Sequence, residues 1–246
     1  MASEQIKPYD PKGEKRRQVE VMFDNIAPTY DAFNHVLSLG IDKLWRRNAI
    51  RYIRRNHQGP LDQILDVATG TGDFAIRACN ALHPQHITGI DISEGMMEVG
   101  RRKVAKEGLT DHISMTREDC SALSFADGQF DVVMSAFALR NFAHIDQCLR
   151  EMHRVMRNGG TLTVIDLCAP RRFPMKQVFW IYQHWLMPTI GSLFSHDRKA
   201  YKYLPATMKA ILQGSDMAEK FQQAGFQHVD YRYLAFGMCC RYTATK

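Results

Sequence analysis

Two kinds of hydrophobic pattern divide the chain. Ahead of Gly59 the apolar residues recur at helical spacing, whereas after it short apolar runs alternate with further helical stretches. The first part predicts a helix from Glu14 to Pro28, a short one over Asp31–Ser38 and a longer one over Ile41–Arg55. Residues 1–13 are broken by prolines and a glycine, so we expect no regular structure there.

The second part predicts a sheet. Five apolar runs have the length of buried strands, and helical patterns separate most of them. Strands that alternate with helices are typical of a parallel sheet with helices on both faces and right-handed crossovers. The expected strands are Ile64–Ala68, His86–Ile92, Ile113–Glu118, Phe130–Phe137 and Thr161–Leu167, and the expected helices are 73–82, 94–106 and 144–156.

The pattern changes again beyond Pro170. Val178–Phe194 is rich in large apolar side chains, and a helix is expected at about 206–224. Two closely connected strands, His228–Ala235 and Met238–Ala244, end the chain. Because such a pair runs antiparallel, one of the two must oppose the parallel strands. The sequence therefore predicts an α/β fold with a seven-stranded, mostly parallel sheet and one antiparallel terminal strand.

Composition adds few limits. The net charge of +6 is mild, and its two clusters, Lys12–Arg17 and Arg46–Arg55, are interpreted first as solvated helix faces. None of the six cysteines has zinc-site spacing, so no metal is expected and the thiols are taken as reduced. The polar start lacks the apolar core of a signal peptide, and no apolar run reaches about 18 residues. We therefore expect a cytoplasmic protein.

The stretch Ile64–Phe74, ILDVATGTGDF, is where chemistry is expected first. It has the pattern of a buried strand, a glycine-rich turn and the start of a helix. Gly70 and Gly72 allow a sharp turn and a close backbone approach to a ligand. Such a turn aims backbone N–H groups and a helix N-terminus at the ligand. Many nucleotide-binding folds share this feature, so it does not name the ligand.

Acidic residues at the ends of the next two strands narrow the choice. Asp91 lies about 20 residues after the glycine turn, where a carboxylate can accept hydrogen bonds from both ribose hydroxyls of a nucleoside. The alternative role, an N-cap for helix 94–106, suits Ser93 better. Asp119 could accept from an adenine amino group beside the Cys120 backbone N–H, although a surface turn acid is an equal interpretation.

Two classes of ligand then compete. A nicotinamide dehydrogenase would prefer G-x-G-x-x-G, but Ala75 stands where the third glycine would fall. An S-adenosylmethionine site needs one glycine turn, one ribose acid and one adenine-edge acid. Gly70 and Gly72 with Asp91 and Asp119 match that set. Arg140 and Asn141, just past the fourth strand, are candidates for orienting a second substrate.

Longer segments make the match specific, and the sequence resembles the ubiquinone/menaquinone biosynthesis C-methyltransferase family over nearly its whole length. Phe33 and Asp42 stand where the family usually has Met and His, and positions 158, 166 and 168 usually hold Pro, Glu and Ser. The segments that carry the resemblance are Tyr30–Ser38 with Gly40-Ile41 and Leu44-Trp45, Phe137–Asn141, Arg154–Gly160 running to Cys168, and Ile190–Leu193.

The resemblance implies a class I (Rossmann-like) methyltransferase fold with S-adenosylmethionine as donor. It would place a helical extension at 1–58 and the methyltransferase domain at 59–246, with a substrate or lid insertion at about 171–205. Its cofactor contacts would fall on Thr71, Asp91, Asp119 with Cys120, and Ser135, of which Ser135 rests on the resemblance alone. Gly70 and Gly72 would then approach the methionyl part.

The implied reaction is methylation of a ring carbon of a prenylated hydroquinone, with demethylmenaquinol preferred over the benzoquinol intermediate of ubiquinone synthesis or another small molecule. Arg140 would stabilise the phenolate by charge. Tyr30, Asp31 and His196 are candidate general bases, and water is a further one.

The partners expected from this reaction are few. Val178–Phe194 would pack in the core or hold the polyprenyl tail, and with the basic front helices it could make peripheral membrane contact. No nucleic acid is expected, and the sequence is compatible with a homodimer. A scaffold without catalysis is the remaining alternative.

Overall fold

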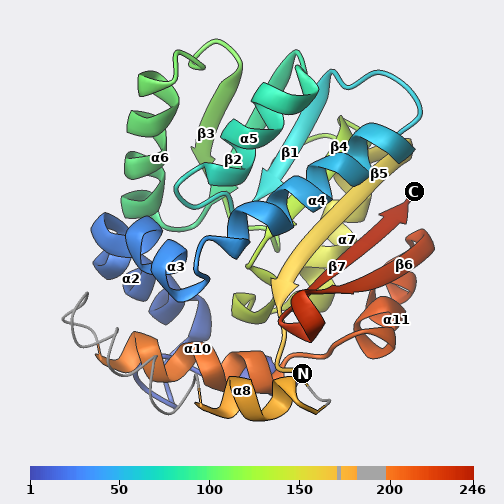
Figure 1. Cartoon of the computed structure of the whole chain (residues 1–246). Helices are drawn as coiled ribbons and strands as arrows, with labels where there is room; N and C mark the ends of the chain where they lie inside the picture. The colour runs from blue at the N-terminus through green and yellow to red at the C-terminus, as the bar shows by residue number, and fades with distance from the viewer. Residues whose placement is uncertain (171–172, 182–197) are drawn as a thin grey trace.

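The computed structural model describes residues 1–170, 173–181 and 198–246. Its centre is a seven-stranded sheet in the order β3-β2-β1-β4-β5-β7-β6 (Figure 1). β7 pairs antiparallel with both β5 and β6, and the remaining pairs are parallel. The predicted sheet and its antiparallel terminal strand are therefore confirmed. The strands are β1 (Gln63–Val67), β2 (His86–Asp91), β3 (Ile113–Arg117), β4 (Phe130–Ala136), β5 (Met156–Leu167), β6 (Gln227–Leu234) and β7 (Cys239–Thr245).

Helices bury both faces of the sheet because the central strands are apolar on both sides. α7 (Ile145–Val155) and α11 (Ser215–Gln223) pack with Leu65, Val133 and Leu162 into one core cluster. α4 (Ile41–Asn56) and α5 (Asp73–Leu82) pack against the other face, in a cluster with Ile64, Val132 and Ile165. Alternate residues along β1, β4 and β5 thus enter opposite cores, which explains their continuous apolar runs.

The front extension folds as four helices. Three were predicted, and they appear as α2 (Lys15–Ile26), α3 (Tyr30–Leu37) and α4. The expectation of an irregular start is wrong for α1 (Ala2–Gln5). The reason is tertiary, because the Glu4 carboxylate accepts from the Ile145 backbone N–H at 2.9 Å and the Lys15 ammonium donates to the Ser3 carbonyl at 2.8 Å.

The later helices differ from expectation in one place. The single helix expected at 206–224 is instead two, α10 (Arg198–Ala210) and α11. Gly214 breaks it with a φ of +61° and donates its N–H to the Tyr242 hydroxyl at 3.0 Å. α8 (Met175–Ile181) begins the apolar stretch Val178–Phe194. The rest of that stretch, with Ile190–Leu193 and the candidate base His196, lies outside the described residues.

The carboxyl ends of the parallel strands face the front helices. In Figure 1, α2, α3, α10 and α8 lie across the edge toward which β1, β2 and β5 point. Between β1 and β4 the chain connections diverge, since β1 continues to β2 on one side and β4 continues to β5 on the other. In open α/β sheets ligands bind at such a switch point. α6 (Glu94–Lys106) follows β2 and contacts β3.

Candidate functional site

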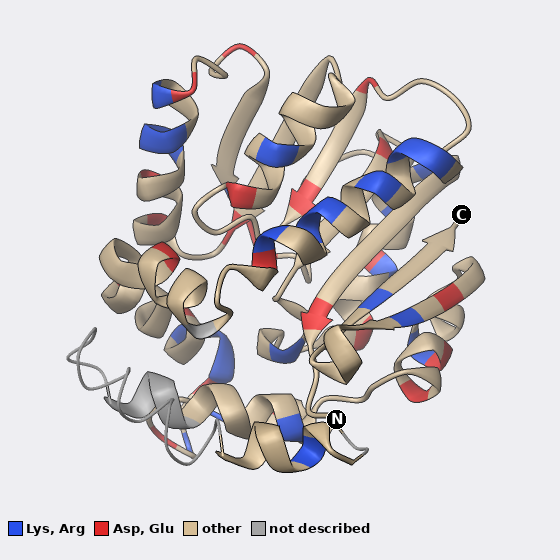
Figure 2. Cartoon of the chain, in the orientation of Figure 1, with Lys and Arg blue, Asp and Glu red and all other residues tan. Residues whose placement is uncertain are grey.

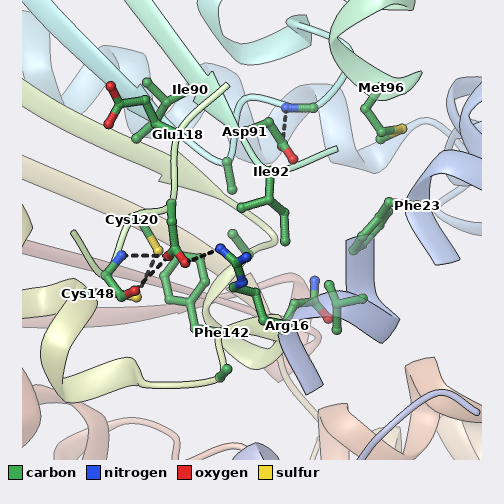
Figure 3. A pocket seen from close by; sticks show the side chains of 18 of the residues that line it. Arg16, Phe23, Ile90, Asp91, Ile92, Met96, Glu118, Cys120, Phe142 and Cys148 are labelled. Atoms are coloured by element: carbon green, nitrogen blue, oxygen red, sulfur yellow. Dashed lines mark hydrogen bonds and ion pairs between the residues drawn. The ribbon is translucent and has the colours of Figure 1, made fainter. Parts of the chain in front are cut away.

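A pocket opens at this switch point, at the carboxyl ends of β1, β2 and β4. It encloses about 800 Å³ of atom-free space, a volume that includes its open mouth. Its walls come from the glycine turn, the end of β2, the loop after β3, the segment after β4, and α2. Figure 3 shows Asp91 and Met96 on one side and Cys120 with Phe142 on the other.

The glycine turn is shaped by left-handed backbone. Gly70 has a φ of +56° and Gly72 a φ of +76°, conformations in which a side chain would be strained. Gly72 is the N-cap of α5, and Gly70 lines the pocket. The Gly70 N–H donates to the Asp91 carboxylate at 2.8 Å. The turn and the predicted ribose acid therefore lie together, as expected. Gly72 shapes the turn but does not itself line the pocket.

Asp91 is held ready to accept hydrogen bonds. Its second oxygen accepts from the Ser93 backbone N–H at 2.9 Å. Burial raises the pKa of Asp91 to about 6, although the backbone donors partly oppose this rise. Ser93 caps α6 by accepting from the Met96 N–H at 3.2 Å, so the N-cap alternative belongs to Ser93 as predicted. Met96 lines the pocket, and Met97 is buried in the core.

The second acid, Asp119, links the pocket to the front extension. Its carboxylate accepts from the Arg16 guanidinium on α2 at 2.8 Å and from the Ser121 backbone N–H at 2.9 Å (Figure 3). These donors lower the pKa of Asp119 against the opposing effect of burial. Because Arg16 and Phe23 also line the pocket, α2 forms one of its walls. The sequence showed no signal for this wall, since the contacts join residues about a hundred positions apart.

Two predicted contact residues have different surroundings. Cys120 lines the pocket, and its Sγ lies 2.8 Å from that of Cys148 on α7. Ser135 is fully buried and donates to the Val67 carbonyl at 2.7 Å. It does not line the pocket, and its neighbours Ala136 and Phe137 do. The side chain of Ser135 thus ties β4 to β1 behind the site.

A polar recess continues from the glycine turn toward α3 and α4. It is lined by Asp66, Arg46 and Thr71 among others. The Thr71 hydroxyl donates to Asp31 at 2.6 Å, and the Thr69 hydroxyl donates to one oxygen of Asp66 at 2.7 Å. The other oxygen of Asp66 and the Nε of Arg46 are buried without a partner. Sequence reasoning missed Asp66, although an acid inside the apolar run ILDV was a signal.

The ionisation of Asp66 should be visible in the pH dependence of stability. Burial raises the pKa of Asp66 to about 7, so the folded protein holds a proton that the unfolded chain releases above about pH 4. Folding therefore loses stability as pH rises through this window. The side chain of Asp66→Asn stays neutral. Between pH 4 and 7 we therefore expect the free energy of unfolding of this variant to rise, relative to that of wild type, by up to about 1.4 kcal/mol per pH unit.

Urea unfolding at several pH values checks this expectation, with the exposed Asp111→Asn as the matched control. A difference between wild type and Asp66→Asn that stays constant with pH would contradict the buried, proton-binding state of Asp66.

Two further pockets meet the first at Tyr30, and the larger of them also shares Phe137 with it. The larger, which we call the acceptor pocket, lies between α3, α4, α8 and α10. It is lined by Tyr30, Asn34, Ser38, Asp42, Trp45, Phe137, Arg140, Leu167, Phe179, Leu204, Met208 and Met238. The other shares Tyr30, Asn34, Arg140 and Leu204 and adds apolar residues of α2 and α3. The chain thus builds two adjoining pockets, and both are lined by apolar side chains with a few polar groups among them.

Arg140 lies at the junction of these spaces. It is buried, forms an ion pair with Asp166, and donates from Nη1 to the Phe137 carbonyl at 2.6 Å. The Lys15 ammonium anchors the same segment by donating to the Arg140 carbonyl at 3.1 Å. The Arg140 Nε has no partner. A buried guanidinium with a free donor beside a cavity is suited to binding an anionic oxygen.

The candidate bases have different surroundings. Burial raises the pKa of Tyr30, against the opposing charge of Arg140 and a hydrogen bond with Asn34. Tyr30 is therefore a protonated hydrogen-bond donor at neutral pH. Asp31 already accepts from Thr71 at 2.6 Å and from the Lys103 ammonium at 2.8 Å. Neither group is arranged as a free base.

Solved structures with this architecture include methyltransferases. A SAM-dependent methyltransferase from Aquifex aeolicus is 17% identical with a TM-score of 0.57, and covers 80% of this chain and 88% of its own. Phosphoethanolamine N-methyltransferase 2 of Haemonchus contortus, in complex with S-adenosyl-L-methionine, is 13% identical with a TM-score of 0.61, over 81% of this chain and 52% of its own. At these identities the likeness establishes the fold.

Sequence comparison is more specific. A demethylmenaquinone methyltransferase of Bacteroides fragilis is 55% identical over 99% of this chain and 98% of its own length. A ubiquinone/menaquinone biosynthesis C-methyltransferase UbiE of Geotalea daltonii is 38% identical over 95% and 98%. The pattern of the ubiE/COQ5 methyltransferase family matches residues 11–246. The chain, with its glycine turn, paired acids and adjoining apolar pocket, belongs to the ubiE/COQ5 methyltransferase family.

Proposed function

We propose that this enzyme transfers a methyl group from S-adenosylmethionine to a ring carbon of demethylmenaquinol, giving menaquinol. The observation that carries the proposal is that a nucleoside-type pocket and an acceptor pocket share Tyr30 and Phe137, with Arg140 on the acceptor side. The demethylmenaquinone methyltransferase of Bacteroides fragilis, at 55% identity, supports the naphthoquinol over the benzoquinol.

The residues present fit S-adenosylmethionine. Asp66 lines a recess beside Gly70 and has one buried oxygen without a partner, and a carboxylate there suits the cofactor's ammonium group. Asp91 would hold the ribose, and Asp119 with Cys120 would hold the adenine edge between Met96 and Phe142. When bound, the cofactor supplies an activated methyl group. The chain itself therefore mainly positions the acceptor and keeps water out.

Arg140 would act on the acceptor. A quinol ring carbon becomes nucleophilic when the neighbouring hydroxyl loses its proton, and a buried positive charge favours that phenolate. The partnerless Nε of Arg140 provides the donor. Tyr30, protonated and half-buried in the same pocket as Arg140, would donate a second hydrogen bond to that oxygen or to the other oxygen on the ring. Phe137, Trp45 and Phe179 would exclude water from the reacting carbon.

The test is labelled methyl transfer from S-adenosylmethionine to reduced demethylmenaquinone and to the benzoquinol intermediate of ubiquinone synthesis, run side by side. We expect turnover with the naphthoquinol and at least tenfold lower kcat/KM with the benzoquinol. A reversed preference would move the enzyme to ubiquinone synthesis. Cofactor binding without transfer to either quinol would refute the proposed acceptor class.

We also propose that α8 makes the contact with a membrane where prenylated quinols reside. Phe179 points into the acceptor pocket, while Trp180 is 55% exposed and Phe173, just before the helix, is 81% exposed. Lys176 and Lys209 line a separate groove beside them, on α8 and α10. Exposed aromatic and aliphatic groups next to lysines are typical of peripheral contact with anionic lipid. Within the described residues, no helix combines the length and apolar character that crossing a bilayer requires.

The basic front helices are less suited to this contact. Lys15 is buried, Arg16 pairs with Asp119, and Arg46 pairs with Asp42. The other basic residues of the second cluster are spread along α4, which lies away from α8 in the view of Figure 2. These ion pairs leave the first cluster with few free charges for lipid.

The double variant Phe173→Ser/Trp180→Ser should therefore lose most binding to anionic phospholipid vesicles in a sedimentation assay, by about tenfold or more. Its activity on a short-tailed, detergent-dispersed quinol should stay close to wild type. The matched control is Leu39→Ser/Phe236→Ser, which removes two exposed apolar side chains elsewhere. Equal vesicle binding by both double variants would exclude α8 as the contact surface.

A further inference from the structure

The proposed reaction releases one proton for each methyl group transferred. The phenolic hydroxyl first gives up its proton, and the new C–C bond then forms at the neighbouring ring carbon. That carbon loses its hydrogen as the ring becomes aromatic again, and the phenolic oxygen regains a proton. The balance is one ring C–H replaced by C–CH₃ and one proton released. In the buried acceptor pocket this proton needs a route to water.

One wall of the acceptor pocket offers a chain of proton-carrying groups. The Ser38 hydroxyl donates to the Asp42 carboxylate at 2.7 Å, and both residues line the pocket. The Nδ1 of His35 lies 3.2 Å and 3.1 Å from the two oxygens of the same carboxylate. Asp42 is almost completely buried, whereas the His35 side chain is 30% exposed. The three groups thus connect the pocket with solvent.

Charged groups from every neighbouring element surround His35. Asp42 and Arg46 come from α4, Asp73 from α5, Lys103 from α6 and Asp31 from His35's own helix α3. The His35 Nε2 lies 4.0 Å from Asp73. Arg46 donates to Asp42 at 2.6 Å, and Lys103 forms ion pairs with both Asp31 and Asp73. An imidazolium at His35 would therefore lie between two carboxylates.

We propose that Ser38, Asp42 and His35 form a proton path out of the acceptor pocket, with His35 as the terminal acceptor. The inference rests on the proposed function, because the proton it carries comes from the acceptor hydroxyl. Ser38 is the catalytic contact, since its Oγ can accept from the substrate. Asp42 carries the proton, and His35 acts through Asp42.

The steps balance along the chain. The Ser38 Oγ accepts the phenolic proton while its own proton passes to Asp42. Asp42 passes that proton to the lone pair on the His35 Nδ1, with the Nε2–H turned toward Asp73. Burial acts to raise the pKa of Asp42, but the Ser38 hydrogen bond and the charges of Arg46 and His35 lower it overall. Asp42 therefore does not retain the proton. The partly exposed imidazolium of His35 then releases it to water.

A metal ion is a poorer occupant of this cluster. His35, Asp42 and Asp73 have ligand atoms within 4.8 Å of one another. Arg46 and Lys103 already supply the positive charge that these carboxylates need. Because these ion pairs already neutralise the carboxylates, a metal ion would gain little by binding there. A proton path therefore explains the arrangement better.

The test is the pH profile of kcat/KM for the quinol. In wild type we expect an acid limb in which kcat/KM falls tenfold per pH unit, because a path that is already protonated cannot accept the substrate's proton. His35→Gln should lower kcat/KM about 10²-fold near pH 7.5 and abolish that limb. In His35→Ala, added imidazole should restore activity, because the ring position reaches solvent. Rescue of this kind would not follow from a merely structural role.

Controls separate this inference from the proposed function. His112→Gln, an exposed histidine at the far end of the sheet, should leave the profile unchanged. Wild type that methylates the quinol, together with His35→Gln that keeps both its rate and its acid limb, would overturn the proton path alone. The proton path would also be overturned if His35→Ala is inactive, binds S-adenosylmethionine normally in calorimetry and is not rescued by imidazole. Failure of wild type to methylate any quinol would instead overturn the proposed function.

Discussion

Replacing Arg140 with methionine is expected to lower kcat/KM for the quinol by about 10²–10³-fold, while the affinity for S-adenosylmethionine stays within about threefold. Methionine fills similar volume but has neither the charge nor the free Nε donor that the acceptor oxygen would use. Arg140 lines both acceptor-side pockets and is absent from the lining of the cofactor pocket. The loss should therefore fall on the acceptor step, measured by labelled methyl transfer and calorimetry.

The ion pair with Asp166 complicates the single variant. Removing one partner of a buried pair leaves an uncompensated charge, which can cost about 3–5 kcal/mol of stability. The double variant Arg140→Met/Asp166→Asn removes both charges and should recover most of that loss. Asp166→Asn alone keeps the guanidinium and should retain more activity than the double variant. If the double variant folds and turns over the quinol at the rate of Asp166→Asn, the charge of Arg140 plays no part in catalysis.

The features that the sequence predicted are those set by short-range pattern. β1, the glycine turn and α5 follow from an apolar run, two residues that accept left-handed backbone and a helical repeat. Ser93 as the cap of α6 follows in the same way, since the cap bonds a backbone N–H three residues on. Strand ends in a parallel sheet meet at one edge, so the proximity of Asp91 to the turn also followed from order alone.

The features that the sequence did not predict depend on distant contacts. α1 forms because Glu4 and Ser3 find partners on α7 and α2, although its own residues show no helical repeat. The sequence predicted one helix in place of α10 and α11, because a single glycine does not by itself end a helical pattern. The break at Gly214 depends on its N–H donating to Tyr242 on β7, a contact that the sequence does not show. The role of α2 as a pocket wall depends on Arg16 reaching Asp119 across the chain. Periodicity carries no information about such pairs.

The acceptor side shows the same limit. Arg140 was singled out from its place just past the fourth strand and Tyr30 after the family resemblance, and both line one pocket. The relation of Ser38, Asp42 and His35 to that pocket was not expected. The segment Tyr30–Ser38 and Asp42 entered only as part of the family resemblance, which gave none of the three a role. Their geometry appears only when α3 and α4 are folded against each other over the end of β1. Candidate chemistry in the front extension was therefore underestimated.

Replacing Asp91 with alanine is expected to weaken S-adenosylmethionine binding by about 10²-fold or more. Two hydrogen bonds from ribose hydroxyls to one carboxylate are worth about 1.5–3 kcal/mol each. The substitution also releases the Gly70 and Ser93 N–H groups, which Asp91 now holds at 2.8 and 2.9 Å, and so loosens the turn itself. Asp91→Asn should lose less affinity for S-adenosylmethionine than Asp91→Ala, because the asparagine side-chain carbonyl keeps one acceptor. Calorimetric titration measures each affinity.

The comparison with Asp119 makes this prediction sharp. Both acids already accept hydrogen bonds from the protein at each oxygen. Asp119 would add one bond from the adenine amino group, whereas Asp91 would add two from the ribose, so Asp119→Ala should weaken binding less, by about tenfold. The two acids should also differ in pH dependence. The pKa of Asp91 is raised to about 6 and that of Asp119 is lowered. Protonation of Asp91 removes acceptor capacity, so wild-type affinity should fall as pH drops below about 6, and Asp91→Asn should abolish that fall. An acid-side loss of affinity that survives in Asp91→Asn would mean that another group, with Asp66 the first candidate, controls cofactor binding in this pH range.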